Sequence, residues 1–260
     1  MWTADPHASY NNFMATKRKL KPKSIPSLGI MDAECRRIDE LLDQDDKASL
    51  QEAISLLRVV AKSGDAWAQY MLGFMYQEGT GLRRSLKEAK TWYALSAAQG
   101  FDSAQLNLGI LLANDPEPDF KEAIRLYRLA AEQGNANAAY NLGLYYELGR
   151  GVRKNRQTSF EWYLIAAEGG EADSQCVVGY CYFNGEGVAE DIKQAVRWYR
   201  RAAKNGSPSA MFNLSVCYRN GEGVRANKRQ EISWLLEAAE YGHEASINRL
   251  TELAIAGEIA

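Results

Sequence analysis

Large apolar and small residues recur along the chain with a period close to 36 residues. Six glycines mark this period. A tryptophan or a leucine stands eight residues before each of these glycines, and a glycine or a serine stands nine residues after each of the first five glycines. A fixed period of this length predicts an array of similar units that stack on one another. The six glycines are Gly64, Gly100, Gly134, Gly170, Gly206 and Gly242.

The second half of each period predicts an amphipathic helix, here called helix B. In one copy, apolar or small side chains at Ala195, Trp198, Tyr199, Ala202 and Ala203 form a stripe with helical spacing. The recurring glycine ends the helix, as expected where the chain turns through a left-handed conformation. Every copy begins with a side chain able to accept hydrogen bonds from the first turn, at Ser85, Asp119, Asn155, Asp191 and Asn227.

The first half of each period predicts a second helix, helix A, whose buried face in the first copy holds Ala68, Leu72 and Tyr76. The small residue on helix A, such as Gly73, lets helix B or the next repeat approach the main chain closely. Four of five copies join the helices through Gly-x-Gly, as in "NGEGV", which permits a tight reversal. The second copy has "NDPEPDF" instead, and its prolines stiffen the turn.

These columns of residues resemble the Sel-one-like repeat (SLR) family, a longer-period relative of the tetratricopeptide repeat. The matching segments include "AQYMLGFMYQEGTGL" (68–82), "AAYNLGLYYELGRGV" (138–152) and "WYLIAAEGG" (162–170). The resemblance covers roughly residues 46–256. It implies an all-α fold, a right-handed α/α superhelical solenoid of about 13 helices in antiparallel pairs, that acts as an adaptor or scaffold for other proteins.

The repeat spacing predicts a single solenoid domain, residues 31–260, after a flexible basic N-terminal arm, residues 1–30. The arm contains "TKRKLKPK" (16–23), which reads either as a solubilising segment or as a tether for an acidic partner, a nucleic acid or a membrane surface. Within the domain we expect an opening helix pair (31–64), repeats at 65–100, 101–134, 135–170, 171–206 and 207–242, and a closing helix (243–256) that covers the apolar end.

Composition and charge favour a cytoplasmic protein, or one exported by some other route, and we expect a monomer or a weak dimer. A net charge of −2 gives no global field for nucleic acid or anionic lipid. No apolar run suits a membrane helix, and the first 30 residues lack the apolar stretch of a secretory signal.

Equivalent helices in adjacent repeats lie about 8–10 Å apart, too far for a disulfide. We therefore interpret the cysteines as buried free thiols, at Cys35, Cys176, Cys181 and Cys217.

Several residues could suggest a catalytic or ligand-binding site, but a structural role in the repeats explains them better. The Gly-x-Gly connectors lack the Lys-Ser/Thr and the preceding strand of a phosphate loop. Arg197, Arg200 and Arg201 flank the apolar stripe and read as a solvated face, diluted by nearby acidic residues. The two histidines have no nucleophile placed beside them by a motif. We therefore expect no enzyme activity, no metal and no cofactor.

The face of helix A opposite its buried stripe predicts a protein-binding surface, because helix A lines the concave side of such an array. Aromatic and apolar side chains there, with polar side chains at one rim, suit a protein or peptide partner rather than nucleic acid. The asparagines of this set could instead form hydrogen bonds between repeats. The candidate residues are Tyr70, Phe74, Gln77, Tyr140, Asn141, Leu144, Glu147, Tyr180, Phe183, Asn213 and Arg219.

Two other functions fit the same pattern. The chain could be an immunity or inhibitor protein that neutralises a bacterial toxin or effector by direct binding, as some bacterial proteins resembling this family do. It could also be an enzyme regulator or a weak hydrolase that uses groove carboxylates such as Glu147.

Overall fold

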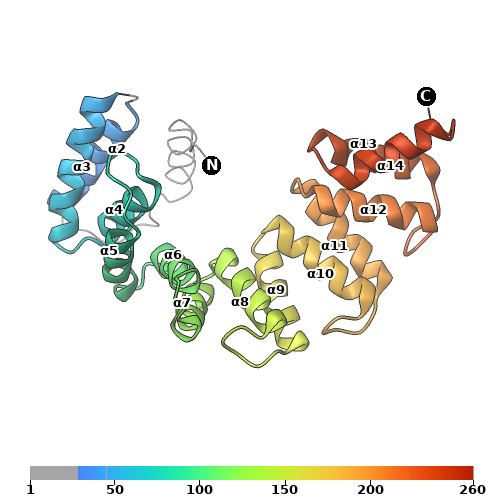
Figure 1. Cartoon of the computed structure of the whole chain (residues 1–260), viewed down its shortest axis with the longest axis horizontal. Coiled ribbons are helices and arrows are strands. Elements are labelled where there is room, and N and C mark those ends of the chain that lie inside the picture. The colour runs from blue at the N-terminus through green and yellow to red at the C-terminus, as the bar shows by residue number, and fades with distance from the viewer. Residues whose placement is uncertain (1–28, 45, 260) are drawn as a thin grey trace. The chain divides into compact units, whose positions relative to one another are not determined.

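The structure, a computed structural model, describes residues 29–44 and 46–259, and every regular element in them is an α-helix (Figure 1). This confirms the predicted all-α repeat solenoid. The basic segment 16–23 lies outside the described residues. The chain divides into two compact units, residues 1–130 and 131–260, which are described separately.

The helices of the first unit are α2 (Gly29–Leu42), α3 (Lys47–Lys62), α4 (Ala66–Glu78), α5 (Leu86–Ala98), α6 (Asp102–Ala113) and α7 (Phe120–Glu132), the last crossing the boundary by two residues. Those of the second unit are α8 (Ala136–Leu148), α9 (Arg156–Glu168), α10 (Ala172–Asn184), α11 (Ile192–Lys204), α12 (Pro208–Asn220), α13 (Lys228–Glu240) and α14 (Glu244–Ile255).

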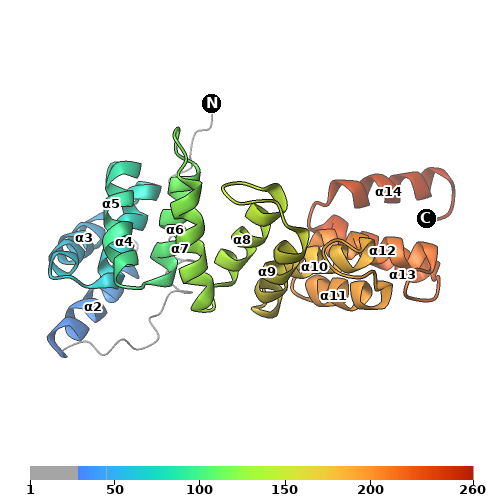
Figure 2. The same cartoon turned by 90° about the horizontal axis from the view of Figure 1, so that it is seen from below.

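In the second unit each helix A packs against its own helix B, and α10, α12 and α14 also pack against the helix B before them. The pairs are α8 with α9, α10 with α11 and α12 with α13, and the contacts between repeats join α9 to α10, α11 to α12 and α13 to α14. Figure 2 shows α14 running beside the last pair. Helices α2 to α6 of the first unit pack in the same sequential way.

The predicted start of helix B is confirmed in all five repeats. In each one a side-chain oxygen accepts a hydrogen bond from the main-chain N–H three residues later, which satisfies a free donor of the first turn. The accepting residues are Ser85, Asp119, Asn155, Asp191 and Asn227. The recurring glycines after helix B have positive φ, as expected for the residue that ends a helix.

A tyrosine of helix B lies flat against the small residue of helix A. A Cβ atom added to Gly179 would lie 2.6 Å from Cδ1 of Tyr199, and Gly73, Gly109 and Gly143 face a tyrosine in the same way. These tyrosines are buried, whereas Trp198 and the other tryptophans one residue earlier are half-buried at the core edge. The main core side chain of helix B is therefore the tyrosine after the tryptophan.

The fifth repeat changes both members of this contact together. Ser215 replaces the glycine and Leu235 replaces the tyrosine, and both are buried. The Ser215 hydroxyl donates a hydrogen bond to the carbonyl of Phe212. The smaller leucine side chain thus makes room for the Cβ and Oγ atoms that glycine lacks.

The two glycines of a connector have different roles. The first, such as Gly185, has a φ of 67° and caps helix A, with its N–H donating to the carbonyl of Cys181. The second faces the first turn of the preceding helix B. A Cβ atom on Gly187 would overlap the carbonyl of Arg156, and one on Gly223 would lie 2.7 Å from the carbonyl oxygen of Ile192.

The shorter connector of the second repeat closes in the same way as the others. The N–H of Asp119 donates to the carbonyl of Leu112 at 3.2 Å, and equivalent bonds in the other four repeats measure 2.8–2.9 Å. An ion pair between Lys90 and Asp115 adds a contact from α5 to this connector. The loss of two residues is thus shared between α6, which is one residue shorter than the A helices of the other four repeats, and the loop after it.

Candidate protein-binding face

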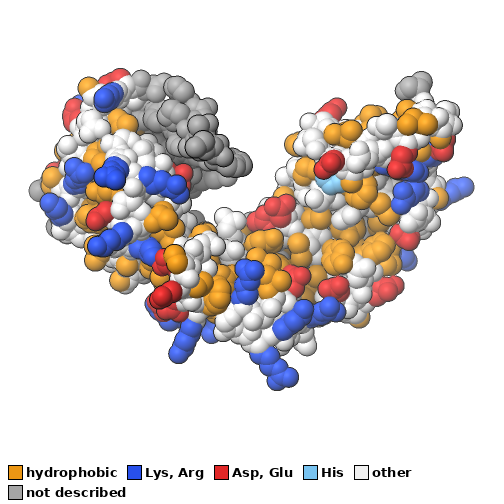
Figure 3. Space-filling model, viewed as in Figure 1, with side chains coloured by type: hydrophobic (Ala, Val, Ile, Leu, Met, Phe, Trp, Pro, Cys, Tyr) orange, Lys and Arg blue, Asp and Glu red, His pale blue; other side chains and the backbone are white. Residues whose placement is uncertain are grey.

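The A helices of the second unit carry most of the predicted site, with Tyr180 and Arg219 exposed and the other predicted residues half-buried. We call the eight predicted residues on α8, α10 and α12 the helix-A face. They are Tyr140, Asn141, Leu144, Glu147, Tyr180, Phe183, Asn213 and Arg219. Figure 3 shows hydrophobic side chains at the surface around α10.

Tyr180 is the large aromatic side chain of this face that solvent reaches most easily, with 49% of its surface exposed. Phe74 occupies the equivalent position in the first repeat and is only 8% exposed. Phe183, one turn further along α10, is half-buried against the core cluster that contains Met211 and Leu214. The face therefore combines the exposed side chain of Tyr180 with the half-buried ring of Phe183.

Acidic groups surround Tyr140 on α8. Its ring centroid lies 5.5 Å from that of Tyr163, whose hydroxyl donates a 2.6 Å hydrogen bond to Oε2 of Glu147. Burial raises the pKa of Tyr140, and the carboxylates of Asp173, Glu171 and Glu147 raise it further. Burial, followed by Glu171, also raises the pKa of Asp173. Three carboxylates thus act on Tyr140 at this end of the face.

The asparagines of the predicted site could bind a partner or form hydrogen bonds between repeats, and their contacts in the structure bear on this choice. Nδ2 of Asn213 lies 3.7 Å from Sγ of Cys176 in the preceding repeat. The equivalent Asn107 donates to the hydroxyls of Tyr70 and Tyr93 at 3.5 and 3.2 Å. These contacts all join neighbouring repeats, whereas no such bond involves Asn141 among the described residues. Arg219 is exposed, and its Nε donates to Oδ1 of Asn220.

The three predicted site residues of the first unit differ from those of the second. Tyr70 is 2% exposed and Phe74 is 8% exposed, and both belong to the core cluster of that unit. Gln77 is half-buried and accepts a 3.1 Å hydrogen bond from the hydroxyl of Tyr93. These side chains already have partners in the fold and are therefore not available to a protein partner in the way that Tyr180 is.

Leu148 is an exposed apolar residue that the sequence pattern did not predict as part of the site. It ends α8 with 48% of its surface exposed. Its position, five residues after Gly143, lies on the outward side of the helix, so periodicity could have identified it. The equivalent positions in the next two repeats hold Asn184 and Asn220, which makes this apolar residue specific to α8.

The Sel1 repeat pattern matches five consecutive segments, residues 68–101, 102–135, 136–171, 172–207 and 208–243. The chain belongs to the Sel1 repeat family. Each segment begins one to three residues after the start predicted from spacing. Sel1 repeat proteins are generally protein-interaction scaffolds and typically have no enzymatic activity.

Solved structures support this family. The chain is 32% identical, with a TM-score of 0.75, to a protective antigen of uropathogenic Escherichia coli, over 78% of this chain and 44% of that one. It is 28% identical, with a TM-score of 0.74, to a Sel1 repeat protein of Oxalobacter formigenes, over 84% and 87%. An immunity protein of Pseudomonas aeruginosa shares the fold alone, at 17% identity and TM-score 0.53 over 87% and 86%. The matched stretches span about an eighth of the curated relatives' length.

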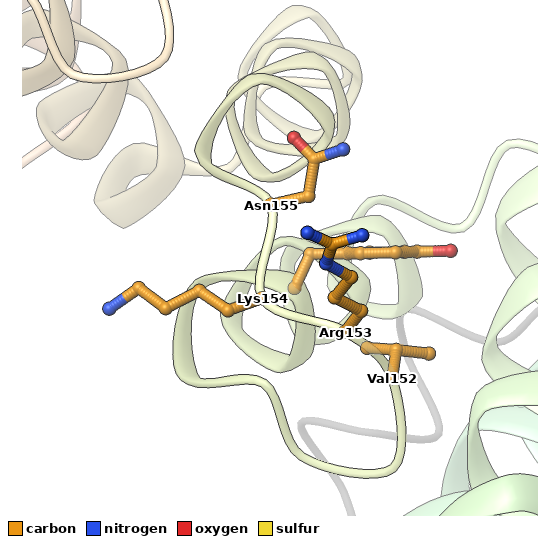
Figure 4. A pocket seen from close by; sticks show the side chains of 5 residues that line it. Val152, Arg153, Lys154 and Asn155 are labelled. Atoms are coloured by element: carbon orange, nitrogen blue, oxygen red, sulfur yellow. The ribbon is translucent and has the colours of Figure 1, made fainter.

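A hollow at the connector between α8 and α9 of this Sel1 repeat protein was not predicted. Its volume is about 510 Å³, and Figure 4 shows Lys154 pointing away from Arg153 there. Asn155 in the same hollow caps α9. The lining therefore belongs largely to the turn, and we assign it no function. The other lining residues are Tyr146 and Val152.

No helix among residues 29–44 and 46–259 combines the length and the apolar character needed to cross a membrane.

The buried cysteines are predicted to react slowly with thiol reagents in the native protein. Burial raises the pKa of Cys176 and Cys217 to about 11 and that of Cys181 to about 12, so at pH 8 their thiols stay protonated. Cys35 is half-buried. With Ellman's reagent we expect at most one fast-reacting thiol in the native chain and four after unfolding. A Cys35→Ser variant should show no fast phase. Two or more fast thiols in the native protein would contradict the burial described.

Proposed function

We propose that this Sel1 repeat protein is a non-enzymatic adaptor that binds a protein or peptide partner through the helix-A face of its second unit. The observation that carries the proposal is the exposure of Tyr180 at a position where the first repeat buries Phe74. Tyrosine is enriched at protein interfaces, because its ring buries a large apolar area while its hydroxyl bonds at the rim. Leu148 adds an exposed apolar side chain to the A helices of the same unit.

Two potential catalytic groups have structural partners. The carboxylate of Glu147 accepts the hydrogen bond from Tyr163, and His243 uses its Nδ1 to cap α14 at Ser246. The ring centroid of His243 also lies 5.1 Å from that of Phe212. These contacts support a role in packing for both side chains. A weak hydrolase function would predict that Glu147→Gln abolishes turnover of a candidate substrate.

The double variant Tyr140→Ala, Tyr180→Ala tests the proposed face. Removing two aromatic side chains from the centre of an interface should weaken partner binding at least about tenfold. Tyr180 is half exposed and Tyr140 is partly so, and therefore helicity by circular dichroism should change little. The measurement is affinity capture from the native host with mass spectrometry, followed by titration of the recovered partner against both proteins.

A control and a deletion make this result specific. Leu236→Ala, Tyr241→Ala removes two exposed apolar side chains from the B side, 52% and 60% exposed, and should leave partner binding unchanged. Deleting residues 1–30 tests the basic arm. If that deletion abolishes binding while the Tyr140, Tyr180 pair has no effect, then the arm is the binding site and the proposed face is wrong.

An immunity or inhibitor function would use the same kind of face and is distinguished by the partner and the stoichiometry. A tight 1:1 complex that abolishes the activity of a toxin would favour an inhibitor. Simultaneous binding of two or more proteins, without loss of their activity, would favour an adaptor.

A further inference from the structure

Helix α11, the helix B of the fourth repeat, carries a row of basic side chains on its outer side. All five are exposed, and the helix contains no acidic residue. They follow one another at intervals of three, four or one residue, which places them on one broad side of the helix. We call this set the basic stripe, formed by Lys193, Arg197, Arg200, Arg201 and Lys204.

The basic stripe has no part in the core contacts of α11. The buried side chains of the helix are Ala195, Val196, Tyr199, Ala202 and Ala203, on the opposite side. Other B helices fold with different residues at the stripe positions. The five corresponding residues of α5 are Lys87, Thr91, Ala94, Leu95 and Ala98, and those of α13 are Arg229, Ser233, Leu236, Glu237 and Glu240. The repeat frame therefore does not require five cations here.

Within the described part of the chain, the stripe has hydrogen-bond partners but no ion pairs. Arg200 donates to the hydroxyl of Tyr218 at 3.0 Å, and Arg201 donates to the main-chain carbonyl of Glu168 at 3.4 Å. The guanidinium of Arg201 also lies 5.1 Å from the ring centroid of Trp198. Of the acidic residues in the preceding connector, Asp191 accepts the hydrogen bond that caps α11.

Such a row of unpaired like charges is unfavourable for an isolated helix. Lys193 and Arg197, Arg197 and Arg201, and Arg200 and Lys204 are each four residues apart, where like charges destabilise a helix. The helix dipole offsets this repulsion only near the C-terminal end, at Arg201 and Lys204. An arrangement that costs stability and adds no core contact indicates a binding role for the stripe.

We infer that the basic stripe of α11 is a second interaction surface, which binds an acidic segment of a protein partner. The stripe spans twelve residues, or about 16 Å of helix, the length of a short peptide. Three of the five side chains are arginines, whose planar guanidinium groups pair with carboxylates through two parallel hydrogen bonds. A chain with net charge −2 gives no wider positive field for an extended polyanion such as nucleic acid. The inference does not depend on the helix-A face.

The test uses the full chain and a synthetic acidic peptide. The probe is a fluorescein-labelled peptide of about twelve residues, with glutamates spaced to match the stripe and alanine or glutamine elsewhere. Fluorescence anisotropy should show binding at low salt that weakens as salt is added. The variant Lys193→Gln, Arg197→Gln, Lys204→Gln, which leaves both hydrogen-bonded arginines in place, should weaken binding at least about tenfold.

A matched control removes three exposed cations from another B-type helix. Lys47→Gln, Arg58→Gln, Lys62→Gln on α3 changes the net charge by the same amount and should alter peptide affinity less than about twofold. The α11 variant should also melt about 2 °C or more above the wild type, since it removes like-charge repulsion. A lower melting temperature would show that the cations stabilise the fold, which would overturn the argument.

Other outcomes also contradict the inference. They are an absence of peptide binding by the full chain, or equal binding by the wild type and the α11 variant. Tighter binding of an oligothymidylate of equal charge would assign the stripe to nucleic acid. Tighter binding of vesicles containing phosphatidylserine would assign it to a membrane surface.

Discussion

Replacement of Gly179 by leucine is expected to destabilise the second unit by about 3 kcal/mol or more. The Cβ atom alone would lie 2.6 and 2.7 Å from two ring carbons of Tyr199 and 3.2 Å from the carbonyl oxygen of Ala195. Tyr199 is 2% exposed and has no room to move away. The rest of the leucine side chain would force α10 and α11 apart. Urea unfolding followed by circular dichroism measures the loss, and unchanged stability would rule out the described packing of Gly179.

The fifth repeat provides a control for this prediction. Gly179→Ser should destabilise the chain, and adding Tyr199→Leu should recover part of the loss. The double variant reproduces the Ser215 and Leu235 pair that the fifth repeat already uses. A coupling free energy near zero in the double-mutant cycle would mean that the two positions do not contact each other as described.

Replacement of Arg249 by leucine is expected to destabilise the closing helix by about 2–4 kcal/mol. Oε1 of Glu231 on α13 lies 3.7 Å from Nε of Arg249 on α14, and Lys228 lies 3.3 Å from the other carboxylate oxygen. The Glu231 side chain is 2% exposed, so removing one cation leaves a buried carboxylate only partly compensated. Thermal unfolding, with hydrogen exchange of the α14 amides, measures the effect.

The repeats themselves suggest the rescue variant. Three of the other four repeats have alanine at the position of Glu231, at Ala89, Ala123 and Ala195. Glu231→Ala should therefore be nearly neutral, and it should remove most of the cost of Arg249→Leu when the two are combined. If the double variant is as unstable as Arg249→Leu alone, then Arg249 acts through packing of its aliphatic stem rather than through the ion pair.

The fold could be predicted from sequence because its determinants are local and recur in phase. The caps at Ser85 and Asp191 and the terminal glycines depend on one turn of chain each, so residue type alone identifies them. The main core side chain of helix B was harder to predict. Trp198 and Tyr199 both belong to the apolar stripe, and only the position of Gly179 on the facing helix determines which of them is fully buried.

The candidate site was less predictable, because exposure depends on neighbours outside the repeat. Phe74 and Tyr180 occupy equivalent positions, yet one is buried and the other is half exposed. The recurring asparagines of helix A could bind a partner or form hydrogen bonds between repeats. The contacts of Asn107 and Asn213 favour hydrogen bonds between repeats. The basic stripe of α11 was visible as a charge run. Its lack of ion pairs among the described residues required coordinates.

The second glycine of the last two connectors affects how these repeats can evolve. Gly187 and Gly223 lie closest to main-chain carbonyls of the preceding helix B, so their nearest contacts involve atoms that every amino acid possesses. Substitutions on the surface of α9 or α11 therefore leave the distance between successive repeats unchanged. One repeat can acquire a new surface, as α11 has with its five cations, without a compensating change in the next. Diversification of binding surfaces in this chain can thus proceed repeat by repeat.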